Sequence, residues 1–237
     1  MRITNCRSYQ EMSDLAASLV MEELLSKPDL LLCAATGGSP EGLYRELART
    51  ASREKSLFNQ LRVMKLDEWG GVPAYYPVTC EFFLKKKLLE PLGIPGDHYI
   101  SFASDPEDPE EECRQIRSRL KKEGPIDLCI LGLGRNGHMG LNEPGPGLEP
   151  YCHVASLSES SIQHSMIASL DRKPRYGLTL GMQEILSSRK IIMLVSGKEK
   201  KQVAKQFLEK KITTSLPASF LWLHPRVECL VDQTILN

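Results

Sequence analysis

The sequence predicts an α/β protein: a single-domain, Rossmann-like fold with a doubly wound, mostly parallel sheet flanked by helices. Short apolar runs alternate with longer stretches of helical period, and Gly, Pro or Asp residues bound the apolar runs. The composition is 41% hydrophobic and 25% charged, which are globular values. The 237 residues can bury a large core, and we expect one domain over residues 1–237.

Six apolar runs have the length and composition of strands, and six other segments have the period of helices. We predict strands at Leu30–Ala34, Leu61–Leu66, Ile126–Leu131, His153–Leu157, Ile191–Val195 and Val227–Val231. We predict helices at Tyr9–Leu25, Pro40–Thr50, Thr79–Leu89, Glu110–Lys121, Gly181–Ser187 and Lys200–Leu208. Ligands of open parallel sheets bind beyond the carboxyl ends of the strands, so the residues after each run are the first site candidates.

The charge and cysteine content exclude several classes of function. The 30 basic residues balance 30 acidic ones, so no excess charge favours nucleic acid or an anionic membrane. No apolar run approaches the ~20 residues of a membrane span, and the N-terminus lacks a signal-peptide pattern. The seven cysteines are scattered without a Cys-x-x-Cys pair, which favours neither a disulfide framework nor a metal site. We therefore expect a cytoplasmic protein.

A glycine-rich turn, Thr36-Gly37-Gly38-Ser39, connects the first predicted strand to a helix, with Ser39 expected as its N-cap. Glycines let the backbone approach an anion, and the free amides at a helix N-terminus attract phosphate. An ordinary βα turn is the alternative interpretation. Lys200 lies in the first turn of another helix, where a cation is disfavoured unless an anion compensates. Lys200 is a candidate for binding the same anion, and a solvated surface lysine is the alternative interpretation.

Two carboxylates, Asp67 and Glu68, directly follow the strand that ends at Leu66. Adjacent residues of an extended chain point to opposite faces, so the two cannot easily share a role. We expect one to face the crevice and the other to brace the fold. Solvated loop acids are the alternative.

The strand at Ile126–Leu131 runs into a Gly-x-Gly-x-x-Gly string formed by Gly132, Gly134 and Gly137. Such a string suggests a dinucleotide-binding turn, but the prolines and glycines of residues 144–147 cannot open the long helix on which a pyrophosphate sits. The glycines instead present His138, with Glu143 close behind. An imidazole titrates near neutral pH and a carboxylate can orient it, which predicts a proton-transfer site.

Together these segments resemble the glucosamine-6-phosphate deaminase family, which shares its fold with the 6-phosphogluconolactonases. The resemblance rests on residues 36–40, 66–69, 134–144, 178–181, 197–200 and 221–225. The Gly-His-x-x-x-Asn-Glu-Pro string favours the deaminases, because lactonases have Ser-Leu-Phe-Pro-like residues at Leu141-Asn142-Glu143-Pro144. Within the family, residues 66–69, 79–81, 131–138 and 217–224 look most similar to the galactosamine-6-phosphate deaminase/isomerase branch.

The resemblance implies conversion of galactosamine 6-phosphate to tagatose 6-phosphate and ammonia, without a metal or cofactor. His138 would assist ring opening and Asp67 would move a proton from C2 to C1, with Glu143 and Asn136 beside the imidazole. Thr36, Gly37, Gly38, Ser39, Gly134 and Lys200 would hold the 6-phosphate. The partner would be a small sugar phosphate, and a homo-oligomer is compatible with this assignment. The alternatives are a glucosamine-6-phosphate deaminase, a 6-phosphogluconolactonase and a non-catalytic sugar-phosphate-sensing domain.

The chain departs from the family pattern at three places. Most glucosamine-6-phosphate deaminases carry an aspartate at the position of Asn136, so only Glu143 remains to stabilise an imidazolium. The phosphate-binding arginine of the family has no clear counterpart, and His164, Arg172 or Arg175 could replace it. The allosteric members carry basic residues where this chain has His153 and Ala155, so we expect little activation by N-acetylhexosamine 6-phosphate.

Overall fold

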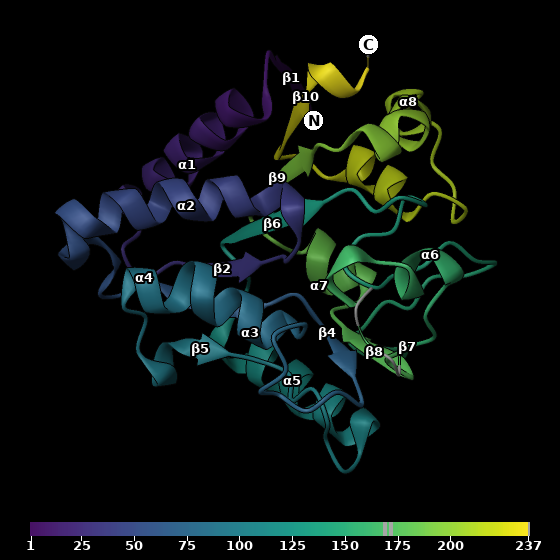
Figure 1. Cartoon of the computed structure of the whole chain (residues 1–237), viewed down its shortest axis with the longest axis horizontal. Coiled ribbons are helices and arrows are strands. Elements are labelled where there is room, and N and C mark those ends of the chain that lie inside the picture. The colour runs from purple at the N-terminus through teal and green to yellow at the C-terminus, as the bar shows by residue number, and fades with distance from the viewer. Residues whose placement is uncertain (168–169, 171–172, 237) are drawn as a thin grey trace.

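The computed structural model describes residues 1–167, 170 and 173–236, and its central element is a seven-stranded sheet (Figure 1). The strands run in the order β1-β10-β9-β6-β2-β3-β5, and every neighbouring pair is parallel. Their bounds are β1 (Arg2–Cys6), β2 (Leu31–Ala34), β3 (Arg62–Lys65), β5 (Tyr99–Ile100), β6 (Leu128–Gly132), β9 (Lys190–Val195) and β10 (Val227–Asp232). The predicted mostly parallel sheet is confirmed.

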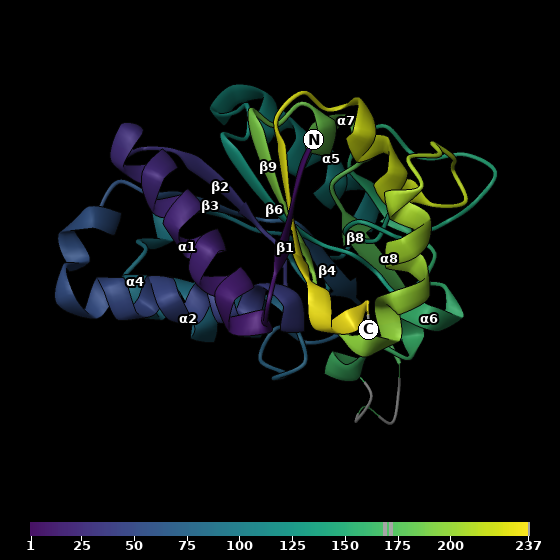
Figure 2. The ribbon, with the colours of Figure 1, turned by 90° about the horizontal axis from the view of Figure 1, so that it is seen from above.

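Helices cover both faces of this sheet. Figure 2 shows α1, α2 and α4 on one side of the strands and α7 and α8 on the other. The helices are α1 (Tyr9–Ser26), α2 (Gly38–Arg53), α3 (Cys80–Leu84), α4 (Glu90–Leu92), α5 (Pro109–Glu123), α6 (Glu159–Ile162), α7 (Met182–Leu186) and α8 (Lys201–Leu208). Successive strand residues enter different cores: Leu32 packs with the cluster of α1 and α2, whereas Leu31 packs with that of α5, α7 and α8. This alternation is the doubly wound arrangement that the sequence predicts.

A second, antiparallel sheet stands beyond the carboxyl end of β3. It contains β4 (Asp67–Gly70), β8 (Tyr176–Thr179) and β7 (His153–Ala155), in that order. Only Leu66 separates β3 from β4, so the chain passes directly from the large sheet into the small one. The strand predicted at His153–Leu157 exists over its first three residues, but its expected place in the parallel sheet is wrong.

Several elements lack a strong sequence signal. β1 and β5 lie at the two edges of the large sheet, and the first four residues of β1 are at least partly exposed, so they form no apolar run. The helix predicted at Thr79–Leu89 is α3, followed by a π-helical turn (Lys85–Leu89) and then α4. The remaining turns are 3-10 helices: η1 (Lys55–Phe58), η3 (Gly96–His98), η4 (Ser165–Ile167), η5 (Lys198–Lys200), η6 (Pro217–Leu223) and η7 (Gln233–Ile235).

The start of α2 differs from the prediction by two residues. The helix begins at Gly38, and Gly37 is its N-cap with φ 97°. That left-handed conformation favours glycine, so Ser39 lies within the first turn instead of capping it. Among the described helices, none is long and apolar enough to cross a membrane.

Candidate active site

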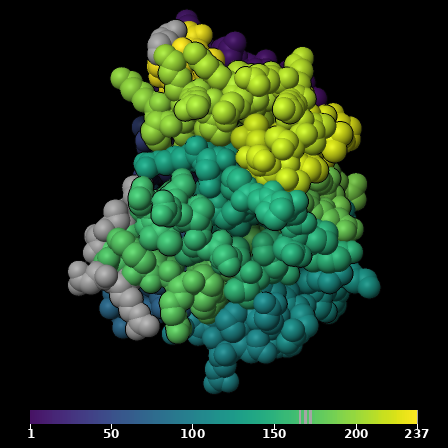
Figure 3. Space-filling view, turned by 90° about the vertical axis from the view of Figure 1, so that its right-hand side faces the viewer, coloured from purple at the N-terminus to yellow at the C-terminus, as the bar shows by residue number. Residues whose placement is uncertain are grey.

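A cavity of about 410 Å³ opens at the carboxyl ends of the parallel strands. Residues that follow β2, β3, β6 and β9 line it, together with Asp232 at the end of β10. This is the region where open α/β sheets bind ligands, and the volume is in the range of small-molecule sites. On the face drawn in Figure 3, the yellow-green C-terminal segment lies above the green segment that follows β6.

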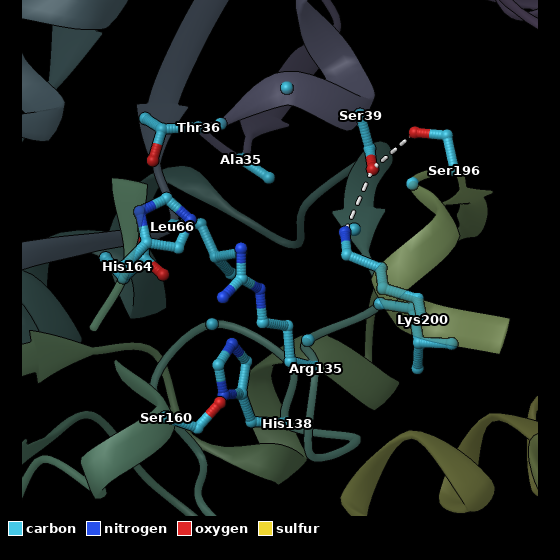
Figure 4. A pocket seen from close by; sticks show the side chains of 18 of the residues that line it. Ala35, Thr36, Ser39, Leu66, Arg135, His138, Ser160, His164, Ser196 and Lys200 are labelled. Carbon is cyan, nitrogen blue, oxygen red and sulfur yellow. Dashed lines mark hydrogen bonds between the residues drawn. The ribbon is translucent and has the colours of Figure 1, made fainter. Parts of the chain in front are cut away.

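The turn at the start of α2 forms one wall of the cavity, and Thr36, Gly37, Gly38 and Ser39 all line it. The buried Ser39 hydroxyl lies 2.9 Å from Ser196 Oγ and accepts a hydrogen bond from Lys200 Nζ at 3.2 Å (Figure 4). A helix N-terminus and an ammonium group therefore share one wall, and both favour an anion. The predicted proximity of Lys200 to this turn is found in the structure.

Asp67 and Glu68 point to different places, as the alternation predicts. Asp67 lines the cavity, while Glu68 is fully buried behind it. Glu68 accepts hydrogen bonds from the backbone amides of Trp69, Cys80 and Glu81, each at 2.8 Å. Glu68 therefore fastens the start of α3 to β4 and braces the strand that carries Asp67.

The buried carboxylate of Glu68 is balanced by Lys65, which sequence reasoning did not single out. The Lys65 ammonium is fully buried and donates to Glu68 at 2.7 Å, to Glu81 at 2.9 Å and to the Phe102 carbonyl at 2.8 Å. These three partners satisfy all three of its N–H donors. A strand lysine adjacent to an acidic pair is the signal that would have identified this network.

The environment of Asp67 favours a proton-accepting role. Burial, and then the charge of Glu68, raise its pKa from 3.8 to about 7, against the opposing charges of His138 and Lys65. The Cys80 thiol donates to Asp67 Oδ1 at 3.9 Å and accepts from Thr36 Oγ1 at 3.3 Å. A carboxylate that titrates near the operating pH can accept and return a proton efficiently.

His138 lines the cavity, and Glu143 lies behind it. The imidazole Nδ1 is 3.4 Å from Glu143 Oε2, and Ser161 Oγ is 3.4 Å from the same nitrogen and donates to Glu143 Oε1. Burial opposes the ionisation of Glu143, but its hydrogen bonds and the charge of His138 outweigh burial and lower its pKa to about 2. An ionised carboxylate therefore orients the imidazole on its far side.

Asn136 also lies behind His138 and contacts the cavity only through its neighbours. Its amide nitrogen donates to Glu143 Oε2 at 2.8 Å and to Ser158 Oγ at 3.2 Å. Its carbonyl oxygen accepts from the His138 backbone amide at 3.2 Å. Asn136 therefore connects the carboxylate to the turn that carries the imidazole.

The glycines of the loop make room for His138 instead of opening a nucleotide-binding helix. A Cβ on Gly134 would lie 2.2 Å from the His138 ring, so the imidazole requires glycine there. Gly137 has φ 89°, and its amide closes the turn onto the Gly134 carbonyl at 3.0 Å. Residues 133–158 contain no helix, so the dinucleotide alternative loses its structural basis.

The three candidates for replacing the family's phosphate-binding arginine differ in their position relative to the cavity. His164 lines the cavity and packs against Trp69, with ring centroids 5.8 Å apart. Burial, followed by the charges of His138, Lys200 and Arg135, lowers the pKa of His164 to about 4. Its ring is therefore neutral near pH 7. Arg175 lies over Gly71 and does not line the cavity, and Arg172 lies outside the described residues.

Sequence reasoning missed several residues of the cavity wall: Tyr9, Cys80, Arg135, Ser160 and Asp232. Arg135 and Asp232 could have been found, since both stand at or just after the carboxyl end of a strand. Tyr9 and Ser160 come from helix starts far away in the chain, where no local pattern marks them. Among residues 1–167, 170 and 173–236, no three His, Cys, Asp or Glu side chains are grouped to hold a metal ion.

A family profile described as glucosamine-6-phosphate isomerases/6-phosphogluconolactonase matches residues 8–231. The chain belongs to this family. It is 40% identical over 225 residues to the putative deaminase AgaI of Escherichia coli K12, covering 95% of this chain and 89% of that protein. It is 36% identical over 236 residues to glucosamine-6-phosphate deaminase 1 of Bacillus subtilis 168, covering 98% and 97% of the two chains.

Solved structures of the family agree with the fold. A monomeric glucosamine-6-phosphate deaminase superposes with a TM-score of 0.93 at 35% identity, over the whole of both chains. The 6-phosphogluconolactonase of Trypanosoma cruzi superposes with a TM-score of 0.80 at 21% identity, covering 99% of this chain and 95% of that one, which supports the fold alone. The predicted family, the Rossmann-like α/β fold and the expectation of an enzyme are confirmed.

Proposed function

We propose that this enzyme converts galactosamine 6-phosphate and water into tagatose 6-phosphate and ammonia. The observation that carries the proposal is the placement of Asp67, whose pKa is raised to about 7, in one cavity with His138. The Lys200–Ser39 wall of the same cavity suits the 6-phosphate. A general acid–base pair and an anion anchor are the groups that an aldose–ketose isomerisation requires.

The chemistry follows from these positions. His138 would move a proton at the ring oxygen as the pyranose opens, while the ionised Glu143 holds the imidazole from behind. Asp67 would take the proton from C2 and return it at C1, which forms an imine at C2. Water would add to that carbon and ammonia would leave. Each positioned proton transfer contributes about 10²–10⁴-fold, so the proposal relies on the two groups together with phosphate anchoring and invokes no metal or nicotinamide.

Support for the galacto substrate comes from the motifs at residues 66–69, 79–81, 131–138 and 217–224, which look most similar to the galactosamine-6-phosphate branch. Glucosamine 6-phosphate, which would give fructose 6-phosphate, is the second candidate. It is favoured by the 36% identity to a glucosamine-6-phosphate deaminase. Homo-oligomerisation and a cytoplasmic location stay predictions.

The substrate assignment is tested by offering the wild-type enzyme both sugars. We expect ammonia and a ketose 6-phosphate from each productive substrate, with kcat/KM at least about tenfold higher for galactosamine 6-phosphate. A preference for glucosamine 6-phosphate would overturn the galacto assignment and leave the deaminase assignment intact. Hydrolysis of 6-phosphogluconolactone without ammonia release from either amino sugar would overturn both.

A further inference from the structure

Arg135 is a cation that lines the cavity. Its exposed side chain extends into the pocket between His164 and Lys200 (Figure 4). Within the described part of the chain, its guanidinium makes neither a hydrogen bond nor an ion pair. The turn that carries it is fixed, because the Gly134 amide donates to the His138 carbonyl at 3.0 Å and the Gly137 amide to the Gly134 carbonyl at 3.0 Å. A guanidinium held at this place is ready for an external anion.

The charges around Arg135 favour an anion between it and Lys200. Burial lowers the pKa of Lys200, Glu199 raises it, and Arg135 lowers it again, so the two cations repel each other across the cavity. The remaining acids of the wall are Asp67, Glu199 and Asp232. Asp67 interacts with the charge of His138, which lowers the pKa of Asp67. Asp232 accepts hydrogen bonds from both the amide and the hydroxyl of Thr234. A dianion would relieve the repulsion between the two cations.

Of the three candidates named from the sequence, His164 and Arg175 do not supply a second positive charge, and Arg172 lies outside the described residues. His164 is neutral near pH 7, and Arg175 stands outside the cavity wall. The N-terminus of α2 contributes only amides and a partial charge, with the hydroxyl of Ser39 beside it. Among the described cavity residues that could carry a full positive charge toward the α2 turn, Lys200 and Arg135 remain.

We propose that Arg135 binds the 6-phosphate of the substrate together with Lys200 and the amides at the start of α2, in place of the arginine that the family carries elsewhere. The identity of the sugar rests on the proposed function, whereas the phosphate contact concerns this wall of the cavity alone. Because Arg135 and His138 belong to one four-residue turn, phosphate binding there also fixes the imidazole relative to the ring oxygen. One loop therefore contributes a residue to each end of the substrate, Arg135 at the phosphate and His138 at the ring oxygen.

The test compares wild type with Arg135→Met, Arg135→Lys and the control Arg114→Met. Arg114 lies on the outer surface of α5 and pairs with Glu111. The first probe is inorganic phosphate, whose binding is measured by calorimetry and by inhibition of turnover. The second readout is KM and kcat with the hexosamine 6-phosphate. We expect Arg135→Met to weaken phosphate binding at least about tenfold, the usual order for a lost charge-assisted contact. KM should rise by a similar factor, with kcat within about threefold.

The lysine variant should recover part of the phosphate affinity, and Arg114→Met should behave as wild type. Equal phosphate affinity in wild type and Arg135→Met would overturn the inference, as would wild type that does not bind phosphate. If phosphate binding depends on Arg135 while no amino sugar releases ammonia, the phosphate contact stands and the proposed reaction fails. If ammonia is released and Arg135→Met leaves KM and phosphate affinity unchanged, the reaction stands and the Arg135 contact fails.

Discussion

The side-chain amide of Asn136 donates to Glu143 Oε2 at 2.8 Å, and the same carboxylate oxygen lies 3.4 Å from the imidazole of His138. Asn136 therefore acts on the imidazole through Glu143 instead of adding a second charge. An amide is well suited to this position, because it donates to an ionised carboxylate where an aspartate would repel it. The hydrogen bond is one of those that keep the pKa of Glu143 at about 2.

Replacing Asn136 by aspartate should move the acidic limb of the pH–rate profile. A second carboxylate beside Glu143 would stabilise the imidazolium of His138 and disfavour ionisation of nearby acids, Asp67 included. Both effects shift the limb of kcat/KM to higher pH, by about one pH unit. Asn136→Ala, which removes the amide without adding charge, should leave the limb within a few tenths of a unit. An unchanged limb in the aspartate variant would contradict this role of position 136.

Lys65→Met should destabilise the protein strongly, because it leaves the carboxylate of Glu68 buried without its counter-ion. Breaking a buried ion pair by removing one partner costs about 3–5 kcal/mol of unfolding free energy. The matched control is Lys86→Met, which removes an exposed pair with Glu90 and should cost about 1 kcal/mol or less. Urea unfolding of both variants measures the difference, and equal costs would refute the bracing role of the Lys65–Glu68 pair.

The free energy of unfolding of Asp67→Asn, relative to wild type, should increase as the pH rises. The folded pKa of about 7 exceeds the unfolded value of about 3.9, so the native protein binds the extra proton between these pH values. The stability of wild type therefore falls as pH rises from about 4 to 7, an effect absent from the asparagine variant. At about 1.4 kcal/mol for each pKa unit, the gain reaches up to about 4 kcal/mol above pH 7. Thermal unfolding from pH 5 to 8 tests this, with Asp97→Asn as an exposed control whose effect should not vary.

Much of this architecture is readable from local patterns. The buried strands β2, β6 and β9 contain continuous apolar runs, whereas β3 and β10 combine apolar with charged residues. The order of strand and helix predicts the parallel arrangement of these five strands. The opposite orientations of Asp67 and Glu68 follow from the geometry of an extended chain. The prolines after the glycine-rich string exclude a long helix there, which predicts that the glycines present His138. These features depend on residues close together in sequence, where periodicity and turn chemistry decide the structure.

The features that local sequence patterns do not predict depend on contacts between residues far apart in the chain. β4 and β8 are four-residue strands without a continuous apolar run, and they exist because they pair with each other. β7 lies within a predicted strand, but its pairing with β8 outside the parallel sheet is a long-range contact. The burial of Lys65 depends on Glu81 and the Phe102 carbonyl, contributed by other elements. The motif that contains Arg135 indicates His138 as the functional residue. Arg135 becomes a candidate only because the structure places it in the cavity wall opposite Lys200.

The most direct measurement of the central claim is the rate of ammonia release from saturating galactosamine 6-phosphate and glucosamine 6-phosphate, with wild type, Asp67→Asn and His138→Gln. The account predicts ammonia and ketose 6-phosphate in equal amounts from wild type, and a loss of at least about 100-fold in kcat for Asp67→Asn. His138→Gln should lose most activity as well, because ring opening would then lack its proton relay. Wild type that releases no ammonia from either sugar, or Asp67→Asn that retains the full rate, would contradict the account.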